Sequence, residues 1–143
     1  MKIGELARRL NCTPDTIRFY EKEGILPQAD RTDANYRTYN ESHIDRLRFI
    51  RNCRALDMTH EEVRALLEAA DGHSSSCSTI NSLVDDHIDH VSTRIDELVQ
   101  LRQRLVGLRQ KCRCAHPVDR CGIMQELTSR DAPQPKMKTT HLG

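Results

Sequence analysis

The chain has 143 residues, of which 37% are hydrophobic and 30% are charged, and its formal net charge is +1. This composition leaves room for one medium domain, or for a small domain with an extension, and it favours long exposed helices over one large core. No stretch resembles a signal peptide or a membrane span, which argues against a membrane protein and favours a reducing cytoplasm for the six cysteines. The net charge itself neither supports nor excludes a nucleic-acid partner, because a binding face need only be locally basic.

The first fifty residues contain all five aromatic side chains, so the compact core is expected there. Ile3, Leu6 and Leu10 have the spacing of one face of a short helix. Residues 13–15 predict the start of a second helix, with a threonine N-cap, a proline at the first helical position and an aspartate at the positive helix end. Gly24 is expected to end that helix. Two short helices joined by a tight turn are typical of a helix-turn-helix.

A hairpin and two more helices are expected before residue 71. Residues 27–39 combine turn-forming residues with alternating tyrosines, which predicts a two-stranded wing. Asn40 is the expected N-cap of a third helix, and Thr59 with Glu62 has the spacing of a capping box for a fourth. The polar run at 71–76 is the expected domain boundary.

A long helix is expected from 77 to 111, with an apolar residue at every seventh position, in line with Cys77 and Cys112. The residues of this stripe are Val84, Val91, Leu98 and Leu105. At about 1.5 Å per residue, such a helix separates Cys77 from Cys112 by roughly 50 Å, so one chain cannot bring both thiols to one metal ion. Two helices packed antiparallel along the stripe would bring Cys77 of each chain beside Cys112 and Cys121 of the other. The spacing predicts a metal site that exists only in a homodimer.

The segment that follows the long helix offers more ligands than three thiolates. Cys114 and His116 lie in the same expected loop as Cys112. Three sulfurs alone suit lead or mercury, whereas a fourth ligand favours tetrahedral zinc or cadmium. The alternative is that Cys114 is exposed and binds nothing.

His87 and His90 are three residues apart, so they are expected on the same face of the long helix. They suggest a second, weaker metal site. The alternative is that they are polar residues at the border of the dimer seam.

The polar side of the second helix presents Thr16, Arg18 and Lys22, opposite Ile17. A helix of this type in a major groove uses arginine for guanine edges and hydroxyl groups for phosphates. The wing would add Arg31, Tyr36 and Arg37 beside the DNA backbone. The alternative is that these residues form the solvated face of a small helical domain.

Several motifs occur in order over about residues 1–70: Ile3-Gly4-Glu5-Leu6-Ala7, Thr16 to Glu21, Gly24-Ile25-Leu26 and Asn35-Tyr36-Arg37-x-Tyr39. Together they resemble the N-terminal signature of the MerR family of transcriptional regulators. The resemblance implies a winged helix-turn-helix followed by a long antiparallel dimerisation helix. It also implies that Thr16, Arg18, Tyr20, Tyr36 and Arg37 contact DNA. The full set of expected DNA-binding residues is Thr13, Thr16, Arg18, Tyr20, Arg31, Tyr36 and Arg37.

Residues 49–59 and 87–91 look closest to the cadmium- and lead-responsive branch of that family, and Cys77, Cys112 and Cys121 match its three thiolate positions. The resemblance implies an activator that twists promoter DNA with an over-long spacer so that RNA polymerase can engage. The expected inducer is cadmium, lead or zinc, with mercury as a further candidate. Other interpretations are a zinc- or mercury-selective sensor of the same family, a thiol redox sensor or a metal-trafficking protein. Nothing in the sequence suggests an enzyme.

The expected architecture is all-α with a small β wing. It comprises a winged helix-turn-helix DNA-binding domain (1–70), a linker (71–76), a dimerisation helix (77–111), a metal-binding loop with a short helix (112–128) and a disordered tail (129–143).

Overall fold

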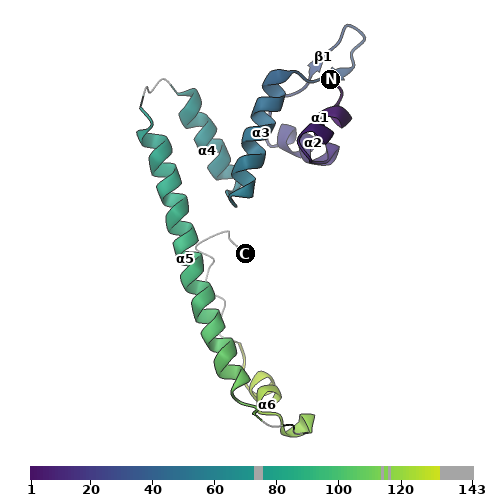
Figure 1. The fold of residues 1–143 in the computed structure, drawn as a ribbon. Coiled ribbons are helices and arrows are strands. Elements are labelled where there is room, and N and C mark those ends of the chain that lie inside the picture. The colour runs from purple at the N-terminus through teal and green to yellow at the C-terminus, as the bar shows by residue number, and fades with distance from the viewer. Residues whose placement is uncertain (73–75, 114, 116, 133–143) are drawn as a thin grey trace. The chain divides into compact units, whose positions relative to one another are not determined.

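The computed structural model describes residues 1–72, 76–113, 115 and 117–132, and these residues fall into two compact units that divide between Val84 and Asp85. The predicted fold class is confirmed, because the described chain is helical except for one two-stranded sheet. The elements in chain order are α1 (Ile3–Arg9), α2 (Pro14–Lys22), β1 (Asp30–Arg31), β2 (Arg37–Thr38), α3 (Glu41–Ala55), α4 (His60–Asp71), α5 (Ser78–Arg109), η1 (Val118–Arg120) and α6 (Gly122–Ser129) (Figure 1).

Side-chain caps begin three of the helices of the first unit, as predicted. Thr13 Oγ1 accepts the N–H of Thr16 at 3.1 Å at the start of α2, and Thr59 with Glu62 forms a reciprocal capping box on α4. At the start of α3 the third helical residue is a histidine: Asn40 Oδ1 accepts the N–H of His43, whose Nδ1 faces the N–H of Asn40 at 3.1 Å. These bonds satisfy N–H groups that have no partner within the helix.

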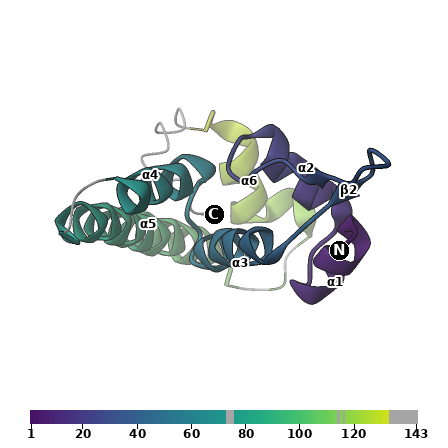
Figure 2. The ribbon, with the colours of Figure 1, turned by 90° about the horizontal axis from the view of Figure 1, so that it is seen from above.

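The core of the first unit lies between α1, α2, α3 and α4. Helices α1 and α2 contact each other, which gives the predicted helix-turn-helix (Figure 2). Gly24 has a φ of +74°, a left-handed conformation that glycine adopts readily, and the chain leaves α2 there as expected. The largest fully buried side chains come from all four of these helices and from the segment after α2: Leu6, Ile17, Ile25, Leu26, Leu47, Ile50 and Val63.

The predicted wing is a short antiparallel hairpin in which Asp30 pairs with Thr38 and Arg31 with Arg37. Its turn is closed by the backbone N–H of Thr32, which donates to the carbonyl of Tyr36 at 2.8 Å. Asn35 has a φ of +65°, a conformation that asparagine tolerates better than most residues. The side chains of Arg31 and Tyr36 in this hairpin are exposed to solvent.

Helix α5 contains 32 residues, so it is about 48 Å long. Its bounds differ from the predicted 77–111 by one residue at the start and two at the end, where the chain forms a turn at 110–111. Leu98 and Leu105 of the predicted stripe are 46% and 56% exposed in the single chain. None of the described helices is long and apolar enough to span a membrane.

In the second unit, α6 and the end of α5 line an apolar groove of about 710 Å³. Its apolar walls include Leu101, Leu105, Leu108 and Leu127. An open apolar groove beside an exposed apolar stripe is the kind of surface that a second helix covers.

Candidate metal centre and DNA-binding surface

Cys112 and Cys121 lie together in the second unit, although they are separated by a loop. Cys112 follows the last turn of α5, where its carbonyl accepts a hydrogen bond from the guanidinium of Arg109. Cys121 directly precedes α6, and the thiol of Cys112 is within hydrogen-bonding contact of its sulfur. Both cysteines are partly buried. The two sulfurs therefore lie together within one chain.

Cys121 occupies the N-terminal end of α6, where the first backbone N–H groups lack helical partners. The N–H of Met124 donates a hydrogen bond to the sulfur of Cys121. The N–H of Ile123 and the thiol of Cys112 also donate to this sulfur. These donors lower the pKa of the Cys121 thiol from its usual 9.0, although desolvation acts in the opposite direction. A stabilised thiolate beside a second thiol suits a thiophilic metal ion, because the thiolate is the form that binds metal.

Cys77 directly precedes α5 and is exposed. Its carbonyl accepts the N–H of Asn81 at 2.8 Å, so it begins the first turn of that helix. Cys77 therefore lies at the start of a helix, as Cys121 does. The whole of α5 separates Cys77 from Cys112 in the sequence. Cys114 and His116, the two other predicted ligands, lie outside the described residues.

The two remaining cysteines belong to the first unit. Cys53 is buried in the core, and burial raises the pKa of its thiol. Cys12 is partly buried, and burial raises the pKa of its thiol as well, while Arg51 acts in the opposite direction. Thiols of this kind remain protonated and behave as small apolar side chains.

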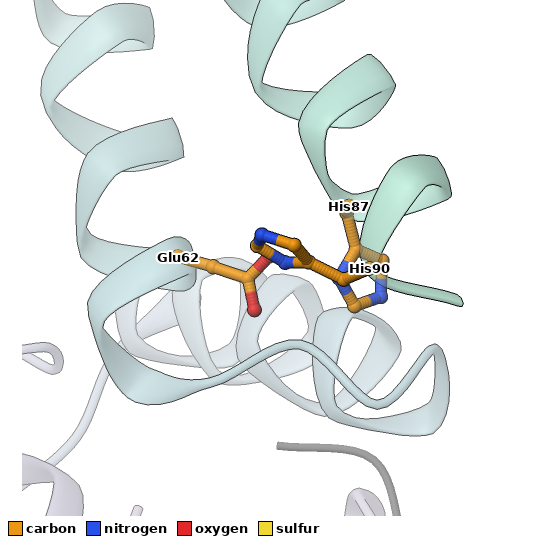
Figure 3. Close-up of side chains that lie close together, drawn as sticks. All are labelled: Glu62, His87 and His90. Carbon is orange, nitrogen blue, oxygen red and sulfur yellow. The ribbon is translucent and has the colours of Figure 1, made fainter. Parts of the chain in front are cut away.

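His87 and His90 lie on the same face of α5, as their spacing predicts. Their ring centroids are 6.3 Å apart and the rings are almost perpendicular. His87 is buried, whereas His90 is only partly buried. Figure 3 shows both rings on α5.

The first unit has a shallow pocket of about 220 Å³ between α2 and the wing. Arg18, Lys22 and Arg37 line it together with Glu21 and Gln28. The three cations concentrate positive charge where α2 and the wing meet. Such a surface suits the phosphate backbone of DNA.

The predicted DNA-binding residues have different surroundings in the structure. Thr13 and Thr16 share a hydrogen bond of 2.9 Å between their hydroxyl groups. Arg18 forms an exposed ion pair of 2.9 Å with Asp15, and Arg31 donates to the carbonyl of Asn35 at 3.2 Å. Tyr36 at the wing tip is 72% exposed.

Tyr20 differs from the other six, because only 5% of it is exposed. Its ring packs within the core and contacts the ring of His60 edge-on, with centroids 5.7 Å apart. This burial favours a packing role for the ring over the DNA contact that the family resemblance implies. The helical spacing with Ile17 already indicated that Tyr20 faces inward.

Sequence reasoning missed a buried polar cluster that joins α2 to the wing. Glu21 accepts a hydrogen bond of 2.6 Å from the hydroxyl of Tyr39, and its other oxygen faces the N–H of Ala29 at 3.4 Å. His43 is also buried, and its Nε2 lies 3.0 Å from the carbonyl of Gln28. The spacing of Asn40 and His43, which matches a capping box, was the one available signal for the histidine.

A helix-turn-helix with a wing, joined to a helix with an exposed apolar stripe, defines the class of winged DNA-binding regulators. Residues 1–70 match the model of MerR HTH family regulatory proteins, and residues 44–108 match the model of the MerR DNA-binding region. The chain belongs to the MerR family of transcriptional regulators, which bind DNA.

Curated relatives and solved structures agree with this assignment. The chain is 48% identical over 111 residues to the HTH-type transcriptional regulator ZntR homolog of Haemophilus influenzae, covering 78% of this chain and 82% of that protein. It is 46% identical to the transcription regulator PbrR691 of Ralstonia metallidurans, solved with lead(II), with a TM-score of 0.80 over 89% of this chain and 98% of that one. The MerR regulator of Bacillus megaterium, solved with mercury(II), has 25% identity and a TM-score of 0.71 over the same shares.

Proposed function

We propose that this chain is a homodimeric, non-enzymatic transcriptional activator that responds to a thiophilic metal ion. The pairing of the Cys112 and Cys121 thiols at the start of α6 is the observation that carries the proposal. Two preorganised sulfurs lower the cost of bringing ligands together around an ion, and a lowered thiol pKa favours the form that binds.

The third ligand is Cys77 of the second chain. Helix α5 is about 48 Å long, and Cys77 directly precedes its start, whereas Cys112 follows its end. An antiparallel pairing of two such helices brings each Cys77 to the Cys112 and Cys121 of the other chain. The exposed leucines of α5 and the apolar groove beside α6 support this pairing, because both leave apolar surface for a partner helix.

The proposed inducer is lead, cadmium or zinc, with mercury as a further candidate. The similar proteins solved with lead(II) and mercury(II) support a soft ion bound by thiolates. The likeness at 46% identity favours the lead-responsive branch. Cys114 and His116, if they bind, would shift the preference towards zinc or cadmium by raising the number of ligands. His87 and His90 are proposed as a second, weaker site.

The N-terminal unit is proposed to read promoter DNA. Helix α2 would enter the major groove with Thr16 and Arg18, while Arg31, Tyr36 and Arg37 of the wing would hold the backbone beside it. Thr13 would contribute through its hydroxyl, which is hydrogen-bonded to the hydroxyl of Thr16. A DNA-binding regulator acts where promoter DNA is transcribed, so we propose the cytoplasm as the compartment and RNA polymerase as the partner.

Metal binding is proposed to change the shape of the DNA more than the affinity for it. The ion would link Cys112 and Cys121 of one chain to Cys77 of the other. This link would alter the relative orientation of the two DNA-binding units. The metal-free dimer would already occupy its operator. Gel shifts with and without metal test this directly, and binding that appears only after metal is added would contradict it.

A mixed dimer tests whether the site needs two chains. Cys77→Ser and Cys112→Ser chains with different tags are co-expressed, and the heterodimer is purified. In the heterodimer, the Cys112→Ser chain keeps Cys77, and the Cys77→Ser chain keeps Cys112 and Cys121. These three cysteines complete one of the two sites, whereas the other site is incomplete. We therefore expect one tightly bound ion per heterodimer and none in either homodimeric variant. A heterodimer that binds no ion would contradict a site shared between chains. Homodimeric variants that bind like the wild type would contradict the choice of cysteines.

A further inference from the structure

Gly122 is the first residue of α6 and directly follows Cys121. A Cβ atom at this position would collide with the carbonyl oxygen of Lys111 and would lie 3.1 Å from its carbonyl carbon and 3.3 Å from its Cβ. The colliding atoms are backbone, so no side-chain rotation relieves the contact. Any other residue at 122 must move the backbone at the start of α6 away from the backbone of Lys111.

This contact lies at the base of the loop that carries the two thiols. Lys111 directly precedes Cys112, and Gly122 directly follows Cys121. The backbones of the residue before Cys112 and the residue after Cys121 therefore approach each other closely. Because each cysteine is the neighbour of a residue in that contact, the two sulfurs are brought within hydrogen-bonding reach.

Two other helical glycines lack such a close neighbour. A Cβ at Gly107, in α5 of the same unit, would meet nothing within 4 Å, and the same is true of Gly4 in α1. Gly122 thus differs from these helical glycines in having a neighbouring backbone where a side chain would begin. The close approach, rather than helix geometry, explains why the residue has no side chain.

We propose that Gly122 is a positioning residue for the metal centre, setting the separation of Cys112 and Cys121 through its contact with Lys111. This inference rests on the proposed metal site and extends it to a residue that binds no metal. A side chain at 122 forces the ends of the loop apart and so increases the distance between the two sulfurs. An ion bound by Cys121 is then too far from Cys112 to bind both. Residues that orient metal ligands without binding the ion commonly account for about 10–100-fold in affinity.

The test compares the full-length wild type with Gly122→Ala, Gly107→Ala, Gly4→Ala and Cys112→Ser. Each protein is titrated with lead(II) or cadmium(II), and the sulfur-to-metal absorption band is recorded in the ultraviolet. We expect Gly122→Ala to bind about 10–100-fold more weakly, with a weaker band per bound ion because fewer sulfurs participate. Gly4→Ala should match the wild type. Gly107→Ala serves as a second control within the sensor unit.

Two outcomes separate this inference from the proposed function. If Cys112→Ser binds metal like the wild type, the metal site itself is wrong. If Cys112→Ser loses binding but Gly122→Ala retains wild-type affinity and band intensity, only the positioning role is overturned. Helical circular dichroism and metal-free promoter binding are measured for each variant, and a Gly122→Ala protein that loses both has a general folding defect, which also contradicts a role confined to the loop.

Discussion

The hydroxyl of Tyr39 donates a hydrogen bond of 2.6 Å to the Oε1 of Glu21, which links the end of the wing to α2. Both side chains are buried, and burial together with the bond to Glu21 raises the pKa of Tyr39. The two residues are 18 positions apart in sequence, so this bond fixes the position of the wing relative to α2. A DNA-binding surface composed of both elements depends on that position.

Removing the Tyr39 hydroxyl is therefore expected to weaken both stability and DNA binding. Tyr39→Phe leaves the buried carboxylate of Glu21 without its short hydrogen bond, which should cost about 1–3 kcal/mol in the free energy of unfolding. Urea denaturation measures the loss, and promoter affinity is measured in parallel. Tyr36→Phe is the control, because that side chain is exposed at the wing tip. Equal stability of the two variants would contradict the role of the Tyr39–Glu21 bond.

Arg18→Ala is expected to reduce promoter affinity by about tenfold or more, because a base-reading arginine commonly contributes 1–3 kcal/mol. If the guanidinium also lies near a phosphate, the slope of log affinity against log salt should decrease by about one. Fluorescence anisotropy at several salt concentrations provides both quantities. Arg48→Ala is the matched control, since Arg48 also pairs with an aspartate three residues earlier but lies on α3. Loss of affinity in both variants alike would indicate a general charge effect.

Leu98→Asp is expected to convert the dimer into a monomer. The side chain is 46% exposed in the single chain and lies on the predicted seam, so the dimer would bury two unpaired carboxylates and lose about 1.5–3 kcal/mol of apolar burial per chain. Light scattering after size-exclusion chromatography reports the mass. Gln103→Asp adds the same charge off the stripe and should remain dimeric. A dimeric Leu98→Asp protein would contradict the seam.

His60 should make the stability of the first unit depend on pH. Its ring lies beside Phe19 and Tyr20, with centroids 5.1 and 5.7 Å away. Burial lowers the pKa of His60 from its usual 6.5, Arg54 and Arg64 lower it further, and Glu23 acts in the opposite direction. The unfolded chain therefore binds the proton more readily, so this contribution to stability is complete above pH 6.5 and is lost as the pH falls towards the folded-state pKa.

The measurement compares the free energy of unfolding of the wild type and His60→Gln between pH 5 and 7.5. The variant should lose less stability than the wild type as the solution is acidified, because glutamine binds no proton. Other histidines contribute equally to both proteins, so the difference between the two slopes isolates His60. Identical slopes would show that its environment does not oppose protonation.

The sequence by itself determined the elements, because their signals are local. Capping residues such as Thr13, Asn40 and Thr59 lie within three positions of the N–H groups that they satisfy, and the seven-residue stripe of α5 repeats within one helix. The spacing of Cys77 and Cys112 likewise follows from the rise of that helix. Family membership followed from motifs that are also local.

Only the tertiary structure decided which distant residues meet. The bond between Glu21 and Tyr39, the contact of His43 with the carbonyl of Gln28, and the contact of Gly122 with Lys111 all depend on how separate segments pack. No local pattern specifies such contacts, because burial and close backbone approach arise from the whole fold. For the proposed metal centre, the sequence predicts the thiols, and the fold brings Cys112 and Cys121 together in one chain.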